Sequence, residues 1–154
     1  MLDTLEPAGS RVLLEHPALN LYLANFSSDE RWILVTAENG FDPPRLFAVP
    51  FRPPYPIPAA TGVDLGEGVF GRWAPSGNRI CFLRDHQGSR CLYTLALDPA
   101  TKRPLGEPAP VLHFHSAWRS HLQLDPGMFR LMVAREKFVF PPGETQSNLW
   151  LAEP

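Results

Sequence analysis

The chain of 154 residues has only two cysteines, a net charge of −2 and no long run of apolar residues. Its 14 basic residues are scattered among 16 acidic ones, so it lacks the basic surface that binding to a nucleic-acid backbone requires. No stretch approaches membrane-spanning length, and residues 1–7 hold acids and a proline where a secretory signal would be basic and then apolar. We therefore expect a soluble, cytoplasmic protein with neither a nucleic-acid nor a membrane partner.

The two cysteines are expected to stay reduced. Cys81 lies in one strand of a predicted hairpin and Cys91 in the next. If residues whose numbers sum to 175 face each other across the turn, Cys81 faces Thr94 and Cys91 faces Arg84. Strand alternation then places the two thiols on opposite faces of the sheet, which disfavours a disulfide. Both cysteines are interpreted as structural.

Helix-forming stretches are also scarce. The chain contains 18 prolines and 11 glycines, which interrupt any helix of useful length. Only residues 129–137 could form a short helix, and their composition suits a strand equally well. The composition predicts an all-β protein.

What the sequence does contain is a repeated segment. Residues 26–35 read FSSDERWILV, and residues 73–82, 47 positions later, read WAPSGNRICF, with turn residues before an apolar strand in both. The copies continue through residues 45–49 and 90–95 after a short turn in each. A fixed period in the 40s with alternating turns and strands is typical of blade repeats.

A third, degenerate copy closes the sequence. It consists of an expected strand at 137–140, a turn at 141–147 and a strand at 148–151. We interpret residues 1–154 as one β-propeller-like domain. Its repeats are expected at about 11–58, 59–108 and 109–154.

Each repeat has the pattern of one propeller blade. Residues 19–25, 31–37 and 45–51 predict three consecutive antiparallel strands, and a fourth strand is expected at 57–61 in the first repeat and at 110–114 in the second. Four short antiparallel strands per repeat form a propeller blade. The sequence therefore predicts three four-stranded antiparallel meanders, which make a half-propeller.

Three blades are too few to close a ring, since propellers have roughly 4 to 8. Residues 11–15 form a spare strand before the first blade, and the last repeat lacks one. Either two chains form a homodimer that completes a six-bladed ring, each giving its first strand to the other's last blade, or the chain is the C-terminal part of a larger propeller.

Residues 72–85, which read RWAPSGNRICFLRD, resemble the W-S-P-D-G-x-x-I-x-F-x-S-D repeat of TolB-like, WD-repeat-like β-propellers. Residues 97–108 (LDPATKRPLGEP) and 143–151 (GETQSNLWL) resemble the end of propellers found behind bacterial serine/threonine kinase domains and winged-helix regulators. The resemblance implies a propeller fold. Ser76 replaces the usual aspartate of the turn, so a ligand that depends on that aspartate is not carried over.

No pattern in the sequence predicts catalysis. His113, His115 and His121 could meet a metal ion, but no cysteine or carboxylate at ligand spacing supports them. The sequence has no G-x-S-x-G nucleophile elbow, and residues 62–68 lack the Gly-Lys-Ser/Thr ending of a phosphate-binding loop and read as a connection between blades. We expect no catalytic residue, no cofactor, no metal and no enzymatic activity.

The four tryptophans separate into core and surface candidates. Trp73 and Trp150 occupy repeat positions expected between blades. Trp32 aligns with Arg79 and is expected to be exposed. Trp32, Trp118, Pro43 and Pro53 are the candidate contacts for a protein partner.

These observations favour a non-catalytic interaction module that serves as a protein–protein scaffold or sensor. Two alternatives stay open. The propeller could gate or regulate a hydrolase, peptidase or kinase, as the resemblance would allow, or it could bind a small ligand in its central channel.

Overall fold

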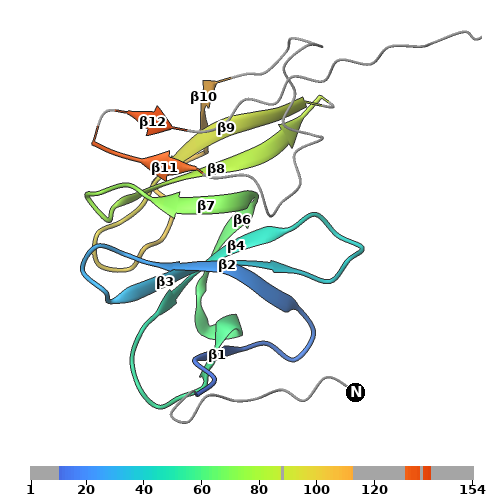
Figure 1. Ribbon diagram of the computed structural model, residues 1–154, viewed down its shortest axis with the longest axis vertical. Helices are drawn as coiled ribbons and strands as arrows, with labels where there is room; N and C mark the ends of the chain where they lie inside the picture. The colour runs from blue at the N-terminus through green and yellow to red at the C-terminus, as the bar shows by residue number, and fades with distance from the viewer. Residues whose placement is uncertain (1–10, 88, 113–130, 136, 140–154) are drawn as a thin grey trace, which may run out of the picture.

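The computed structural model describes residues 11–87, 89–112, 131–135 and 137–139, and over these residues the protein is all-β (Figure 1). The single helical element among them is the three-residue 3₁₀ turn η1 (Ala59–Thr61). Within this part of the chain, no helix has the length and apolar character needed to span a membrane. The predicted fold class is confirmed.

The first sheet contains four antiparallel strands in the order β2 (Asn20–Phe26), β3 (Trp32–Glu38), β4 (Arg45–Pro50) and β6 (Val63–Glu67). Strand β3 is almost completely buried because it lies in the middle of the sheet and has apolar residues on both faces. The turn of residues 27–30 joins β2 to β3, and residues 39–44 join β3 to β4.

The second sheet has the same meander topology. It contains β7 (Val69–Trp73), β8 (Arg79–His86), β9 (Ser89–Ala96) and β10 (Ala109–Leu112), all antiparallel to their neighbours. Across the β8–β9 hairpin, Cys81 pairs with Thr94 and Arg84 with Cys91. The predicted register is thus confirmed, and both cysteines are buried and form no disulfide.

The two sheets share backbone details at an offset of 47 residues. The N–H of Ser27 donates to the carbonyl of Trp32, and the N–H of Ala74 donates to that of Arg79 in the same way. In both sheets the register shifts within the first strand, between positions 22 and 25 and between 69 and 72. Positive φ angles recur in pairs at this offset: Leu23 and Phe70, Glu30 and Gly77, Gly40 and Gln87.

The sheets pack face to face. The core between them contains Leu34 and Leu46 of the first sheet and Ile80 and Phe82 of the second. First strands β2 and β7 are also linked directly, because the Asn25 side-chain amide donates to the carbonyl of Gly71 at 3.0 Å. The first strands of the two sheets therefore lie side by side.

Each sheet also has an outer core. Beyond the second sheet, Cys81, Leu83 and Leu92 pack with Leu131, next to the short antiparallel pair β11 (Met132–Val133) and β12 (Phe138–Val139). Residues 132–133 are therefore strand, the second of the two conformations that residues 129–137 allowed. Outside the first sheet, Val35 and Val49 pack with Ile57 and Ala59.

The fourth strand of the first sheet differs from the prediction. It is β6 at residues 63–67, within the segment interpreted as a connecting loop, and not 57–61. Val63 and Leu65 alternate with polar residues as a strand requires, and Gly66, at φ +92°, lies where the register shifts beside β4. The proline at position 58 has no N–H to donate, which limits strand pairing at 57–61.

The first strand also differs from the prediction. Strand β1 (Leu14–Glu15) pairs with β5 (Ile57–Pro58) of the same chain, and the pairing is parallel, whereas only antiparallel pairing and a spare first strand were expected. The reason is apolar burial, because Leu14 packs against the outer core of the first sheet. The expected strand at 148–151, together with Trp118, Trp150 and the three histidines, lies outside the described residues.

Candidate contact site at Trp32

Trp32 is the first residue of β3 and pairs with Pro50 of β4. Its side chain is half-buried and packs against the core between the two sheets, so the prediction that Trp32 is exposed is wrong. The equivalent position in the second sheet, Arg79, is exposed. The alignment with Arg79 predicted correctly that Trp32 lies at the start of a strand, but it did not predict its burial. Burial differs between the two positions because different residues pack beside each sheet.

Trp32 lines an open hollow of about 530 Å³ at one end of the first sheet. Three segments form its walls: the start of β3, the chain that leaves β4, and the β9–β10 loop. The lining residues are Arg31, Trp32, Pro50, Phe51, Arg52, Pro99 and Ala100.

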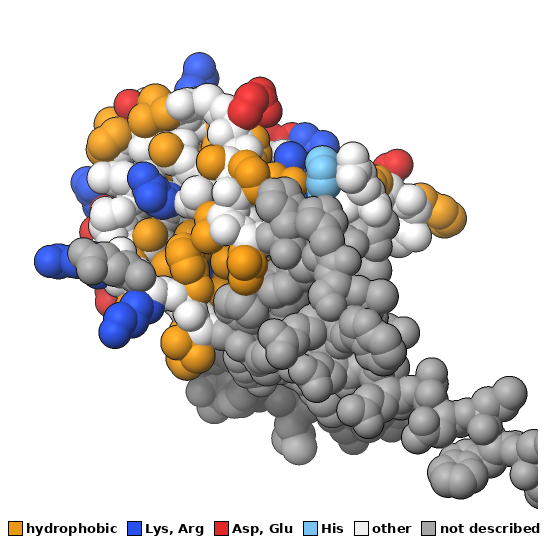
Figure 2. All heavy atoms as spheres, turned by 90° about the horizontal axis from the view of Figure 1, so that it is seen from above, with side chains coloured by type: hydrophobic (Ala, Val, Ile, Leu, Met, Phe, Trp, Pro, Cys, Tyr) orange, Lys and Arg blue, Asp and Glu red, His pale blue; other side chains and the backbone are white. Residues whose placement is uncertain are grey.

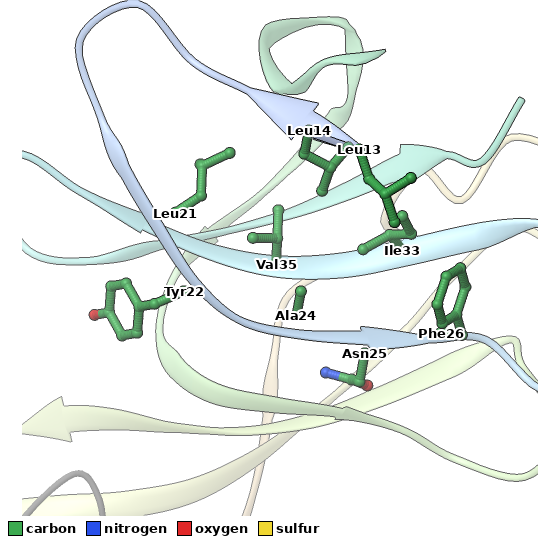
Figure 3. Close-up of a pocket in the computed structure, with 9 residues that line it drawn as sticks. All are labelled: Leu13, Leu14, Leu21, Tyr22, Ala24, Asn25, Phe26, Ile33 and Val35. Atoms are coloured by element: carbon green, nitrogen blue, oxygen red, sulfur yellow. The ribbon is translucent and has the colours of Figure 1, made fainter. Parts of the chain in front are cut away.

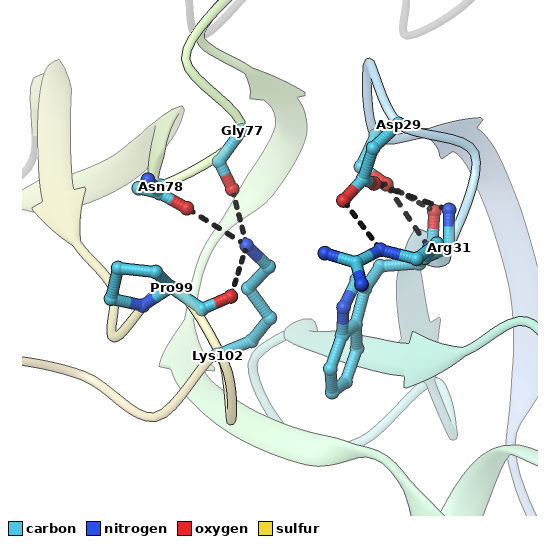
Figure 4. A network of polar contacts seen from close by, with 8 residues as sticks. Asp29, Arg31, Gly77, Asn78, Pro99 and Lys102 are labelled. Atoms are coloured by element: carbon cyan, nitrogen blue, oxygen red, sulfur yellow. Dashed lines mark hydrogen bonds and ion pairs between the residues drawn. The ribbon is translucent and has the colours of Figure 1, made fainter.

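The first wall is positioned by a turn that Asp29 organises. Its carboxylate accepts a hydrogen bond from the Ser27 hydroxyl at 2.6 Å and pairs with the Arg31 Nε at 2.9 Å (Figure 4). The hydrogen bond from Ser27, followed by that from Arg31, holds the pKa of Asp29 below its ordinary value of 3.8. Arg31 is thereby held at the rim of the hollow.

The second wall is tied to the first through the backbone. The N–H of Phe51 donates to the carbonyl of Arg31 at 2.8 Å. The Phe51 ring packs edge-on against Phe26, with 5.0 Å between ring centroids, and tilted against Tyr55 at 5.6 Å. These contacts fix the ring in one orientation, while the neighbouring Arg52 is exposed.

The third wall depends on a buried lysine. Lys102 is 2% exposed, and its ammonium donates to the carbonyls of Gly77 at 2.9 Å and Pro99 at 3.1 Å and to the side-chain oxygen of Asn78 at 2.9 Å (Figure 4). All three N–H groups of the ammonium have an acceptor. Burial lowers the pKa of Lys102 from its ordinary value of 10.5. The bonds join the β9–β10 loop to the β7–β8 turn and hold Pro99 in place.

No pattern in the sequence singled out this lysine, because the basic residues are scattered along the chain. One local signal was present, since an aspartate before a short polar segment favours a tight turn. Asp98 accepts hydrogen bonds from the N–H and hydroxyl of Thr101 at 2.7 and 2.8 Å and from the N–H of Ala100 at 3.0 Å, and these bonds lower its pKa. That signal predicts the turn and not the direction of the Lys102 side chain.

The predicted partner contacts lie in different places. Trp32 lines the hollow, and Pro53 is exposed one residue beyond Arg52, at the same end of the sheet. Pro43 is exposed at the opposite end, within the β3–β4 connection. Trp118 lies outside the described residues.

Other reactive groups among the described residues do not gather into a site. Within this part of the chain, no group of three or more His, Cys, Asp or Glu side chains is placed to hold a metal ion. Burial raises the pKa of Cys81, which keeps its thiol protonated. The Nδ1 of His16 accepts the backbone N–H groups of Ala18 and Leu19, so this imidazole serves a turn.

Comparison of the chain with protein-family models, curated proteins and solved structures found no match. The resemblance to TolB-like propellers stays a prediction from the sequence. Function is therefore inferred from the geometry of the described residues.

Proposed function

We propose that the chain is a non-catalytic protein-binding module and that the Trp32 hollow is its peptide contact site. One observation carries the proposal: Trp32 and Phe51 line an open hollow together with two arginines, Arg31 and Arg52. Half-buried aromatic side chains and arginines are the residues most enriched in protein interfaces. The walls are held by hydrogen bonds and ring contacts, which reduces the entropy lost on binding.

The charges of the hollow favour an acidic partner. Arg31 is neutralised in part by Asp29, whereas no described residue pairs with the guanidinium of Arg52. Pro50 and Pro99 add apolar walls without long side chains that would have to be ordered. An extended peptide with an apolar side chain at Trp32 and a carboxylate near Arg52 fits this arrangement.

We further propose that the sheets are successive blades of a cytoplasmic, TolB-like half-propeller. The backbone details shared at 47 residues, the common meander topology and the face-to-face packing support this arrangement. Gating of an enzyme and ligand binding in a central channel stay alternatives from the sequence.

Selection from a displayed library of random peptides tests the contact site. We expect enrichment of peptides that combine an acidic residue with an apolar or aromatic one, and at least about tenfold weaker binding after Trp32→Ala or Arg52→Glu. Arg103→Glu is the matched control, because Arg103 is exposed in the β9–β10 loop but does not line the hollow. Absence of enrichment, or equal binding by all three folded variants, would show that the hollow is not a peptide site.

A further inference from the structure

The outer face of the first sheet is equivalent to a face that is fully covered in the second sheet. In β8, Ile80 and Phe82 point into the core between the sheets and pack against the first sheet. The residues 47 positions earlier are Ile33 and Val35, which lie on the outer face of β3. The second sheet uses its face at Ile80 and Phe82 to pack against the first sheet. In the first sheet, the equivalent face points outward.

Among the described residues most of this outer face is buried, since Ile33 and Val35 are 3% and 1% exposed, and its exposed part lies at Phe26. The β1–β5 pair covers Val35 and Val49 on one side. Beside it remains an open apolar pocket of about 220 Å³, lined mainly by uncharged side chains that include Leu13, Leu14, Leu21, Phe26 and Ile33 (Figure 3). Phe26 is 47% exposed at its edge.

At the opposite end of the two stacked sheets, the β11–β12 pair also has an exposed apolar face. Leu131 is buried against the second sheet and Val133 packs beside it, so Met132, between them, points away. Val139 is paired directly with Met132 and shares its face. Met132 and Val139 are 61% and 55% exposed, and the view from the β12 end shows neighbouring groups of hydrophobic side chains on the described surface (Figure 2).

We propose that a second copy of this chain covers both faces. The β11–β12 face of each copy packs on the open part of the other copy's outer face, at Phe26 and the apolar pocket beside the β1–β5 pair. Within one chain, the equivalent face of the second sheet, at Ile80 and Phe82, packs against a sheet face that contains Leu34 and Leu46. We expect the outer face of the first sheet to receive a sheet face of the same kind. This proposal does not depend on the Trp32 hollow.

In a dimer, the outer face of each first sheet contacts the β11–β12 face of the other copy, so all four of these faces are covered. A head-to-tail contact repeated around a two-fold axis closes into a ring, whereas a contact that does not close would continue into a filament. If each chain contributes its two four-stranded sheets and the repeat that contains the β11–β12 pair, the ring has six blades, within the range of roughly 4 to 8 seen in propellers. The first strand is not exchanged in this arrangement, since β1 already pairs with β5.

Light scattering with charge variants tests the proposal. The full chain is expected to have twice its mass of 17.2 kDa at micromolar concentration. Phe26→Glu and Met132→Lys should each weaken association at least about tenfold, because each leaves a charge in an apolar contact. Mixing the two variants should restore a dimer, since one of its two junctions is unaltered and the other joins Glu to Lys. Phe41→Glu is the control, because Phe41 is 95% exposed in the β3–β4 connection.

Circular dichroism checks that each variant keeps its strands. A folded wild-type monomer at high micromolar concentration would overturn the proposal and indicate that the chain covers its own faces. A dimer that is weakened by Phe26→Glu but unaffected by Met132→Lys would also overturn it, because this result indicates contact between two equivalent faces.

Discussion

Lys102 places a charged group where the β7–β8 turn meets the β9–β10 loop. Its ammonium binds oxygens of the β7–β8 turn and of its own loop, and the Trp73 ring lies 5.9 Å from it. The lysine therefore joins the second sheet to one wall of the Trp32 hollow. A residue type normally found in solvent serves here as an internal link because every donor is paired.

The two described tryptophans should differ in their contribution to stability. Trp73 is 8% exposed and donates its indole N–H to the carbonyl of Asn25, so Trp73→Ala leaves a cavity between the sheets and should cost about 3–5 kcal/mol. Trp32 is half-buried, and Trp32→Ala should cost about 1–2 kcal/mol. Urea unfolding measures both values, and equal losses would contradict the assigned burial.

Acid should weaken the fold in part through Asp29. Because its pKa is lower in the folded state than its ordinary value of 3.8, ionised Asp29 stabilises the protein above that value. The stabilisation is lost as the pH falls through the folded pKa. Unfolding titrations between pH 7 and pH 3 should show a smaller loss of stability for Asp29→Asn than for the wild type. The exposed neighbour variant Glu30→Gln is the control, and an unchanged pH dependence in Asp29→Asn would contradict this role.

At the scale of elements, the sequence predicted the hairpins better than the strands at the sheet edges. The β8–β9 register followed from the turn position and two apolar strands, and the turns at 27–30 and 74–77 from their small polar residues. Strand β6 was missed because its glycines suggested a loop. A strand was predicted at 11–15, where β1 lies, but its parallel pairing with β5 was not, because the two strands are distant in sequence.

The candidate site was less predictable than the sheets. Trp32 and Pro53 were identified by residue type and do lie at one end of the first sheet, whereas Pro43 lies at the other. The hollow itself depends on Pro99 and Lys102, which come from the next sheet. Contacts between sheets have no local sequence pattern, so the walls could not be derived from the repeat.

Close approach of the two sheets requires glycine before β7. A Cβ at Gly68 would lie 2.5 Å from a ring carbon of Phe82 and 3.0 Å from a methyl group of Leu46. Gly68→Ala should therefore cost about 2–3 kcal/mol by forcing the Phe82 ring out of place. Gly66→Ala, with open space around it and only its φ of +92° to strain, should cost about 1 kcal/mol. Equal unfolding free energies would contradict tight packing at Gly68.

At the scale of the whole molecule, the described sheets stack in one direction. Cores lie between the first and second sheets, between the second sheet and Leu131, and on the outer side of the first sheet. The two unmatched faces therefore lie at opposite ends of the stack. Stacked sheets are about 10 Å apart, so Phe26 and Met132 of one chain should be separated by roughly two such layers.

Cross-linking of single-cysteine positions tests the two-copy ring most directly. Phe26→Cys and Met132→Cys each add an exposed thiol, while Cys81 and Cys91 are buried. With a short bis-maleimide linker, an equimolar mixture of the two variants should give a covalent dimer, and neither variant alone should do so. A covalent dimer from Phe26→Cys alone, or no dimer from the mixture, would contradict head-to-tail closure by a second copy.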